Sequence, residues 1–269
     1  MESLPAVTVH EQTRPALLAV KVPQVTALFW VIKVLTTGMG ETASDFLART
    51  IDPPVAVAGA ALALAGALLV QLRSDRYRTG VYWIAVVMVS IFGTMAADVL
   101  HVALGIPYAI SVLFFAFALV LVLGVWYRTE RTLSIHTVTR GRPELFYWAT
   151  VLVTFALGTA VGDLTAATLG WGYLASGLVF GVAIAVPALL FRVGRLNAIA
   201  AFWAAYVITR PLGASFADWM GVPTARGGLG WGTGPVTAGW ALVIVVLVAV
   251  LATIPEETLK RSVSRFSRR

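Results

Sequence analysis

The chain has 269 residues, of which 59% are apolar and only 12% are charged, and its formal net charge is +7. A soluble domain has about twice this share of charged residues, so the composition argues against a soluble enzyme and against a disordered chain. The absence of cysteine excludes a disulfide scaffold, thiolate catalysis and zinc–sulfur sites. A mean hydropathy of +0.85 is typical of a protein that crosses a membrane several times.

Eight segments are long and apolar enough to cross a bilayer, which requires about 20 residues in each helix. They are predicted at residues 24–48, 54–72, 80–103, 107–127, 145–168, 171–191, 197–220 and 235–253. The predicted fold class is therefore an all-α membrane protein with eight transmembrane helices.

The basic residues indicate the orientation of these helices. Sixteen of the 20 Lys and Arg residues fall in the two termini and in the loops after the second, fourth and sixth helices. The opposite loops hold only Arg49 and Arg226. By the positive-inside rule, both termini are predicted to be cytoplasmic and the protein to be a multi-pass protein of the inner membrane.

One motif recurs in every second helix: an aromatic residue, Trp, nine residues, Gly, four residues and Asp. The motif residues are Trp30, Trp83, Trp148 and Trp203, then Gly40, Gly93, Gly158 and Gly213, then Asp45, Asp98, Asp163 and Asp218. Four matches without a gap predict an internal repeat. Each repeat contains an A helix with the motif and a B helix without it.

The repeats divide the whole chain. Repeats are predicted at 24–79, 80–144 (with a cytoplasmic loop), 145–196 and 197–254, between a cytoplasmic tail at 1–23 and a basic cytoplasmic tail at 255–269. Because two crossings return the chain to the same side, all four repeats are parallel and their symmetry axis lies along the membrane normal. A pseudo-four-fold ring is the simplest closed arrangement, and two pseudo-two-fold halves are the alternative.

The motifs resemble those of a known family, the uncharacterised bacterial integral membrane proteins built from four copies of a repeat of unknown function. The resemblance covers about residues 20–255. It rests on the segment KVPQVTALFWVIKVLTTGMGETASDF and on the three later Gly-to-Asp motifs. It implies the fold and the membrane location, and it implies no activity.

The motif positions indicate distinct roles. The Trp ring at the start of each A helix favours the membrane interface. Each Asp is 15 residues further on, about 22 Å along a helix, which places it in the outer third of a core about 30 Å thick. The alternative is an Asp solvated at the outer headgroups. A small residue precedes each Asp, so each motif Gly belongs to a Gly-x-x-x-small pattern and is predicted to pack helices together.

Residues four apart lie on nearly one face of a helix, so a stripe leads inward from each Asp. The residues four before each Asp are Glu41, Thr94, Thr159 and Ala214, those eight before are Thr37, Ser90, Phe155 and Arg210, and those twelve before are Lys33, Val86, Val151 and Tyr206. The predicted cation site comprises Asp45, Asp98, Asp163, Asp218 and Glu41, the polar path comprises Thr37, Ser90, Thr94 and Thr159, and the charge-tuning or gating residues are Lys33 and Arg210.

The residues predicted to lie within the membrane include five acids and only two bases. Carboxylates that are close together cannot all ionise alone, so some are expected to bind protons or a metal. Carboxylates and hydroxyls suit hard cations, and we therefore expect a transporter or channel for cations, a divalent metal such as Mn²⁺ foremost. The alternatives are a pathway for protons or monovalent cations, and a sensor or assembly module that transports nothing and is held by a structural polar network.

Further candidate metal ligands lie near the motif, namely Met39, Met95, Met220 and His101, which is three residues after Asp98. Methionine also fills apolar helices, so packing is the favoured explanation for each methionine alone. No catalytic motif appears, so an enzyme is not expected. The expected partners are the lipid bilayer and a metal ion or proton as substrate, and no nucleic acid. No covalent cofactor is expected, and a bound divalent cation is the candidate ligand. The sequence leaves the oligomeric state open. The glycine-rich loop at 226–234 is expected over the mouth of the pathway.

Overall fold

The computed structural model describes residues 20–255 and, within them, contains helices and no strands. The predicted tails, at 1–23 and 255–269, lie almost wholly outside the described residues. The A helices are α2 (Ala27–Thr50), α4 (Thr79–Asp98), α6 (Arg142–Asp163) and α9 (Ala198–Gly221). The B helices are α3 (Pro53–Arg73), α5 (Tyr108–Glu130), the pair α7 (Tyr173–Ala183) and α8 (Ala185–Arg192), and α10 (Thr233–Thr253). The prediction of an all-helical chain is confirmed.

Short helical segments extend or connect these elements. The π-helical segments η1 (Val99–Ala103) and η3 (Leu164–Thr168) continue α4 and α6, and the 3₁₀ turns η2 (Ile135–Thr137) and η4 (Thr224–Arg226) lie in loops. The helix predicted at 171–191 is instead divided into α7 and α8 at Ile184. The physical reason is Pro187, which has no N–H to donate to the carbonyl group of Ala183.

Six membrane-crossing units of the described chain are long and apolar enough to span a bilayer: α3, α4 with η1, α5, α6 with η3, α7 with α8, and α10. The helices α2 and α9 are as long, at 24 residues each, but they are not among the six. They contain the charged residues Lys33, Glu41 and Arg210, which lower their hydropathy. Since apolar side chains such as those of Leu113 and Leu242 cover the outside of the bundle, the chain is a membrane protein.

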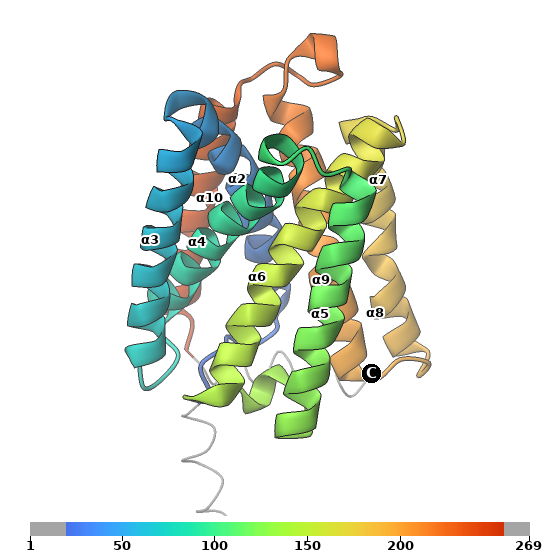
Figure 1. Ribbon diagram of the computed structural model, residues 1–269. Coiled ribbons are helices and arrows are strands. Elements are labelled where there is room, and N and C mark those ends of the chain that lie inside the picture. The colour runs from blue at the N-terminus through green and yellow to red at the C-terminus, as the bar shows by residue number, and fades with distance from the viewer. Residues whose placement is uncertain (1–19, 256–269) are drawn as a thin grey trace, which may run out of the picture.

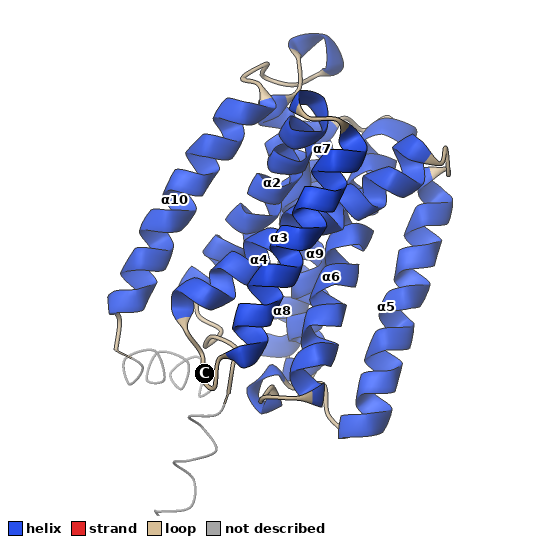
Figure 2. Cartoon of the chain, turned by 60° about the vertical axis from the view of Figure 1, so that its left-hand side comes forward, coloured by secondary structure: helices blue, strands red, loops and turns tan. Residues whose placement is uncertain are grey.

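The A helices form the interior and the B helices lie outside them (Figures 1 and 2). Neighbouring A helices pack together in the order α2, α4, α6 and α9, and α9 packs again on α2. Each B helix packs mainly on the A helix of the next repeat: α3 on α4, α5 on α6, α7 on α9, and α10 on α2. The last repeat therefore packs on the first in the same way as the others pack on their successors.

The motif glycines lie where neighbouring A helices are closest. A methyl group added at any of them would overlap the next A helix at the residue eight before its Asp. The overlapping pairs are Gly40 with Ser90, Gly93 with Phe155, Gly158 with Arg210, and Gly213 with Thr37. The absent side chains thus let four equivalent pairs of helices approach closely, which is how helices associate in lipid.

An aromatic cluster fills the other end of the A helices. The aromatic residue before each motif Trp packs on the Trp of the next repeat, with ring centroids 5.6–6.3 Å apart. The pairs are Phe29 with Trp83, Tyr82 with Trp148, Tyr147 with Trp203, and Phe202 with Trp30. Three of these tryptophans are buried, and only Trp30 is partly exposed. Packing on the preceding repeat thus accounts for the burial of three of these rings, and Trp30 alone of the four keeps a partly exposed ring.

Candidate functional site

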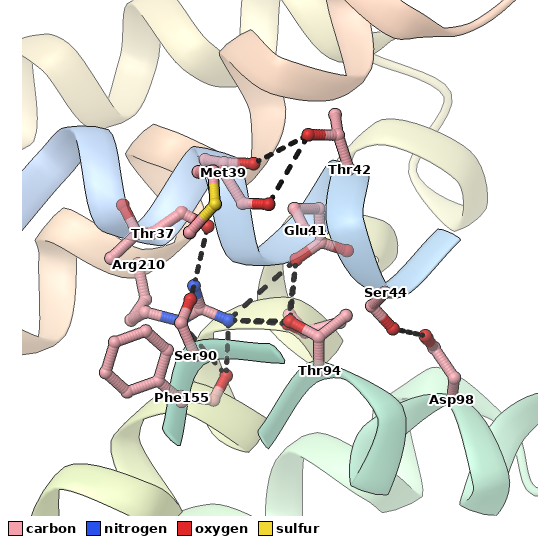
Figure 3. A network of polar contacts seen from close by, with 12 residues as sticks. Thr37, Met39, Glu41, Thr42, Ser44, Ser90, Thr94, Asp98, Phe155 and Arg210 are labelled. Carbon is pink, nitrogen blue, oxygen red and sulfur yellow. Dashed lines mark hydrogen bonds and ion pairs between the residues drawn. The ribbon is translucent and has the colours of Figure 1, made fainter. Parts of the chain in front are cut away.

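A buried polar network occupies the centre of the ring of A helices (Figure 3). Arg210 of α9 is fully buried, and its Nη2 donates hydrogen bonds to the hydroxyls of Thr94 and Thr159, each 3.0 Å away. The same hydroxyls donate to Oε2 of Glu41, over 3.2 Å from Thr94 and 3.0 Å from Thr159. Glu41 Oε2 lies 3.8 Å from Arg210 Nη2. The two threonines therefore link the carboxylate to the guanidinium group.

The rest of the guanidinium group is also satisfied. Its Nη1 donates to the carbonyl oxygen of Thr37 over 2.9 Å and to Ser90 Oγ over 3.3 Å. Its Nε and Nη2 donate to the carbonyl oxygen of Phe155, each over 3.3 Å. Arg210 thus contacts all three other A helices. Because it is held by backbone as well as side-chain acceptors, it fastens the four helices together at this level.

The repeat spacing explains why these residues meet. Glu41, Thr94 and Thr159 hold the position four before the Asp in their helices, and Ser90 and Arg210 hold the position eight before it. Residues four apart share a face, and the equivalent glycine contacts align the helices at one height. The stripe therefore faces inward. The helix α9 continues through Pro211, directly after Arg210, to Gly221.

The four motif Asp residues lie beyond this network, and they differ in their surroundings. Asp98 accepts a hydrogen bond from Ser44 Oγ over 3.4 Å, which joins α4 to α2 (Figure 3). Asp45 pairs with Arg49, one turn further along α2, at 2.7 Å. Asp163 and Asp218 make no side-chain hydrogen bond or ion pair with any residue in 20–255, and Asp218 is only 9% exposed.

Glu41 and the four motif Asp residues, Asp45 included, interact electrostatically and are called the acidic cluster here. The carboxylate groups of Asp98 and Asp163 are close enough to repel each other and Glu41, and that of Asp218 is close enough to repel all three. Arg226, in the loop after α9, acts on this cluster through its attraction to Asp163, and its Nη2 donates to the hydroxyl of Tyr173 over 2.9 Å. This end of the ring is therefore acidic, with two bases beside it, Arg49 and Arg226.

The candidate metal ligands do not gather around one point in the described part of the chain. Among the described residues, no three His, Asp or Glu side chains are placed to hold one metal ion together. His101 stacks on Tyr108 with ring centroids 3.3 Å apart, and its Nδ1 hydrogen-bonds the carbonyl oxygen of Ile106 over 2.8 Å. Met39 and Met95 are buried in the helix packing, and Met220 is partly exposed.

Lys33 lies apart from the hydroxyl network. Its ammonium group is fully buried and makes no hydrogen bond with another described residue. It lies over the rings of Phe155 and Tyr206, 3.9 Å and 4.3 Å from their centroids. The guanidinium carbon of Arg210 is 4.0 Å from the centroid of the same Phe155 ring. The Phe155 ring thus lies against two basic side chains. Lys33 makes no ion pair with a carboxylate of residues 20–255.

Sequence reasoning missed a second buried ion pair at the aromatic end. Lys21 was counted as a topology signal, but its Nζ lies 2.5 Å from Glu144 Oε2 and donates to the carbonyl oxygen of Gln71 over 2.8 Å. Gln71 Nε2 donates to Glu144 Oε1 over 3.0 Å. The available signal was Glu144 itself, an acid at the start of an A helix otherwise flanked by arginines. This cluster ties the segment before α2 to α3 and α6.

These features define a class: a membrane-embedded helical bundle assembled from four copies of a two-helix unit, with a polar network where the copies meet. The family model described as Repeat of Unknown Function (DUF347) matches the chain four times, at residues 28–77, 81–132, 146–195 and 201–254. The chain belongs to this family, as the resemblance predicted. Neither the curated proteins nor the solved structures give a significant match.

Proposed function

We propose that this protein transports cations across the inner membrane, with the acidic cluster as the outer binding site and the Glu41–Arg210 network as the gate. One observation carries the proposal: each repeat supplies an Asp to the acidic cluster, which lies directly beyond the network. Asp163 and Asp218 have no hydrogen-bonded or ion-paired partner among the described residues. A cation is the partner that would relieve their mutual repulsion.

The proposed arrangement in the membrane has eight crossings, pseudo-four-fold symmetry about the membrane normal and both termini in the cytoplasm. The cyclic packing of glycines and aromatic rings supports the symmetry. The length of α2 and α9, about 36 Å at 1.5 Å per residue, is sufficient for a crossing. The distribution of basic residues supports the orientation. The acidic cluster then faces the outside of the cell.

The proposed cargo is a divalent metal ion such as Mn²⁺. Carboxylate oxygens suit such ions, and clustered negative charge raises the local concentration of cations. Because no three acidic or histidine side chains of the described chain converge on one point, the ion would enter the cluster with water still bound. Glu41 is the first carboxylate that it would meet beyond the motif Asp residues.

The path inward is closed at two levels, so we propose a carrier that changes conformation. The buried network closes the first level, and the aromatic cluster closes the second, where the hydroxyls of Tyr82 and Tyr147 are 2.5 Å apart. The charge of Arg210 repels an arriving cation. A cation or proton that neutralises Glu41 would weaken its attraction to Arg210, which would loosen the contacts between α9 and the other A helices.

A proton pathway is the second candidate. Its support is that no three acidic or histidine side chains of residues 20–255 are placed to hold one metal ion, because a proton needs one carboxylate and a metal ion needs several ligands. A polar network that only holds the bundle together is the third. Its support is that every nitrogen of the Arg210 guanidinium group has an acceptor.

Flux into proteoliposomes that contain a metal-sensing dye and a pH dye would distinguish the three. We expect Asp163→Asn and Asp218→Asn to lower Mn²⁺ flux at least tenfold while the melting temperature is retained. Asp75→Asn is the matched control, since Asp75 is exposed and pairs with Arg140 outside the ring. Proton flux alone would select the second candidate. Absence of any flux in a folded, correctly oriented protein would refute transport and leave the third.

A further inference from the structure

A groove of about 340 Å³ opens on the outer surface of the bundle, between the start of α2, α8 and α9. Its lining is mostly apolar and includes Trp30, Ala188, Phe191, Ala198, Phe202 and Ala205. The groove lies at the aromatic end of the bundle, because Trp30 and Ala198 belong to the first turns of their helices. Three of these lining residues are alanines, whose short side chains leave the space open.

A basic connection between α8 and α9 adjoins this groove in the sequence. Residues 192–197 connect Phe191 to Ala198, which are both lining residues. Arg192 and Arg195 lie in this turn with exposed side chains, and neither makes an ion pair with a described residue. By contrast, Arg140 at the same end of the bundle is 2.8 Å from Asp75. Two cationic groups without an ion-pair partner in residues 20–255 therefore lie on the connection between two lining residues of the groove.

Trp30 supplies a third feature. Among the motif tryptophans, Trp203 donates its indole N–H to the carbonyl oxygen of Leu133 over 2.9 Å, and the indole nitrogens of Trp83 and Trp148 are buried. Trp30 is partly exposed, and its indole N–H makes no hydrogen bond within residues 20–255. A partly exposed Trp ring is typical of the depth at which lipid headgroups lie.

We infer that the groove binds one anionic phospholipid of the bilayer. Its acyl chain lies between α8 and α9 against Phe202, its phosphate is bound by Arg192 and Arg195, and the indole N–H of Trp30 donates to an oxygen of the headgroup region. Basic residues beside a space between transmembrane helices are a recurring site for anionic headgroups. The inference rests on the membrane location and does not depend on transport.

Native mass spectrometry of the purified chain, with equal amounts of phosphatidylglycerol and phosphatidylcholine in the detergent, tests this site. We expect retained phosphatidylglycerol and little phosphatidylcholine. Arg192→Gln with Arg195→Gln should weaken phosphatidylglycerol binding about thirtyfold, at about fivefold for each charge. Arg128→Gln with Arg131→Gln, which removes the same charge at the same end, should leave it unchanged.

A substitution that fills the groove tests the contribution of the acyl chain separately from that of the two arginines. Ala205→Phe retains both arginines and should still displace the lipid. Equal retention of the two lipids by the wild type, or an equal loss in both double variants, would overturn the proposal. So would absence of bound lipid in a wild type whose melting temperature shows that it is folded.

Discussion

The ion pair between Glu41 and Arg210 makes a quantitative prediction about stability. Glu41→Gln removes the charge of the one carboxylate within residues 20–255 that contacts this buried guanidinium group, at 3.8 Å, and retains the shape of the side chain. Breaking a buried ion pair costs about 3–5 kcal/mol, because the remaining charge has no counter-ion. We expect the lower end of this range, about 3 kcal/mol, since Arg210 still has its neutral acceptors on α2, α4 and α6.

A double-mutant cycle separates the pair from its surroundings. Arg210→Met removes the charge and leaves the hydroxyls of Thr94 and Thr159 without their donor. The double variant Glu41→Gln with Arg210→Met contains no buried charge at this level. It should therefore be more stable than the sum of the single effects predicts, by about 1–3 kcal/mol, as for residues in one network.

Unfolding in mixed detergent and denaturant, followed by tryptophan fluorescence, measures these differences. Asp45→Asn is the control, because Asp45 pairs with Arg49 across one exposed turn and such a pair contributes about 0.3–0.5 kcal/mol. Strictly additive effects of Glu41→Gln and Arg210→Met would refute the idea that the two charges stabilise each other. A loss for Glu41→Gln no larger than that for the control would do the same.

Three further predictions concern packing, the second ion pair and the hydroxyl links. Gly40→Ala should destabilise the protein by about 1–3 kcal/mol, because the new methyl group overlaps Ser90. Gly59 has open space around it, so Gly59→Ala should stabilise the protein by up to about 1 kcal/mol. Thermal melting of the two variants measures this difference. Lys21→Met should cost about 3–5 kcal/mol by leaving Glu144 buried without its partner, and adding Glu144→Leu should recover part of this loss in the same assay. Thr159→Val should cost about 1–3 kcal/mol, because a buried acceptor of Arg210 is lost without a change of shape; a melting temperature equal to that of the wild type would show that the hydroxyl is dispensable.

Much of the site follows from one repeated spacing. The fixed interval from Gly to Asp sets the height of each A helix against its neighbour, and the interval of four sets the inward face. These two regularities are sufficient to bring Glu41, Thr94 and Thr159 into one layer. They also place Arg210 in the next layer, although they do not indicate which acceptors it uses.

What the sequence left open depends on contacts that have no local pattern. Arg210 binds the carbonyl oxygens of Thr37 and Phe155, and every residue has such an oxygen, so no residue type marks them. Lys33 contacts aromatic rings rather than an acid, because Glu41 on the same helix faces Arg210. The pair of Lys21 and Glu144 joins residues 123 positions apart, beyond the range of any helical periodicity.

The packing of each B helix on the next A helix has a consequence for biosynthesis. The helix α2 is made first, yet its covering helix α10 is made last. Until α10 arrives, the side of α2 that α10 covers stays open to lipid or to the insertion machinery, while α9 supplies Arg210 to Glu41 only when the fourth repeat emerges. The ring therefore closes only when the fourth repeat is in place, and until then the charged helix α2 lacks two of its neighbours, α9 and α10.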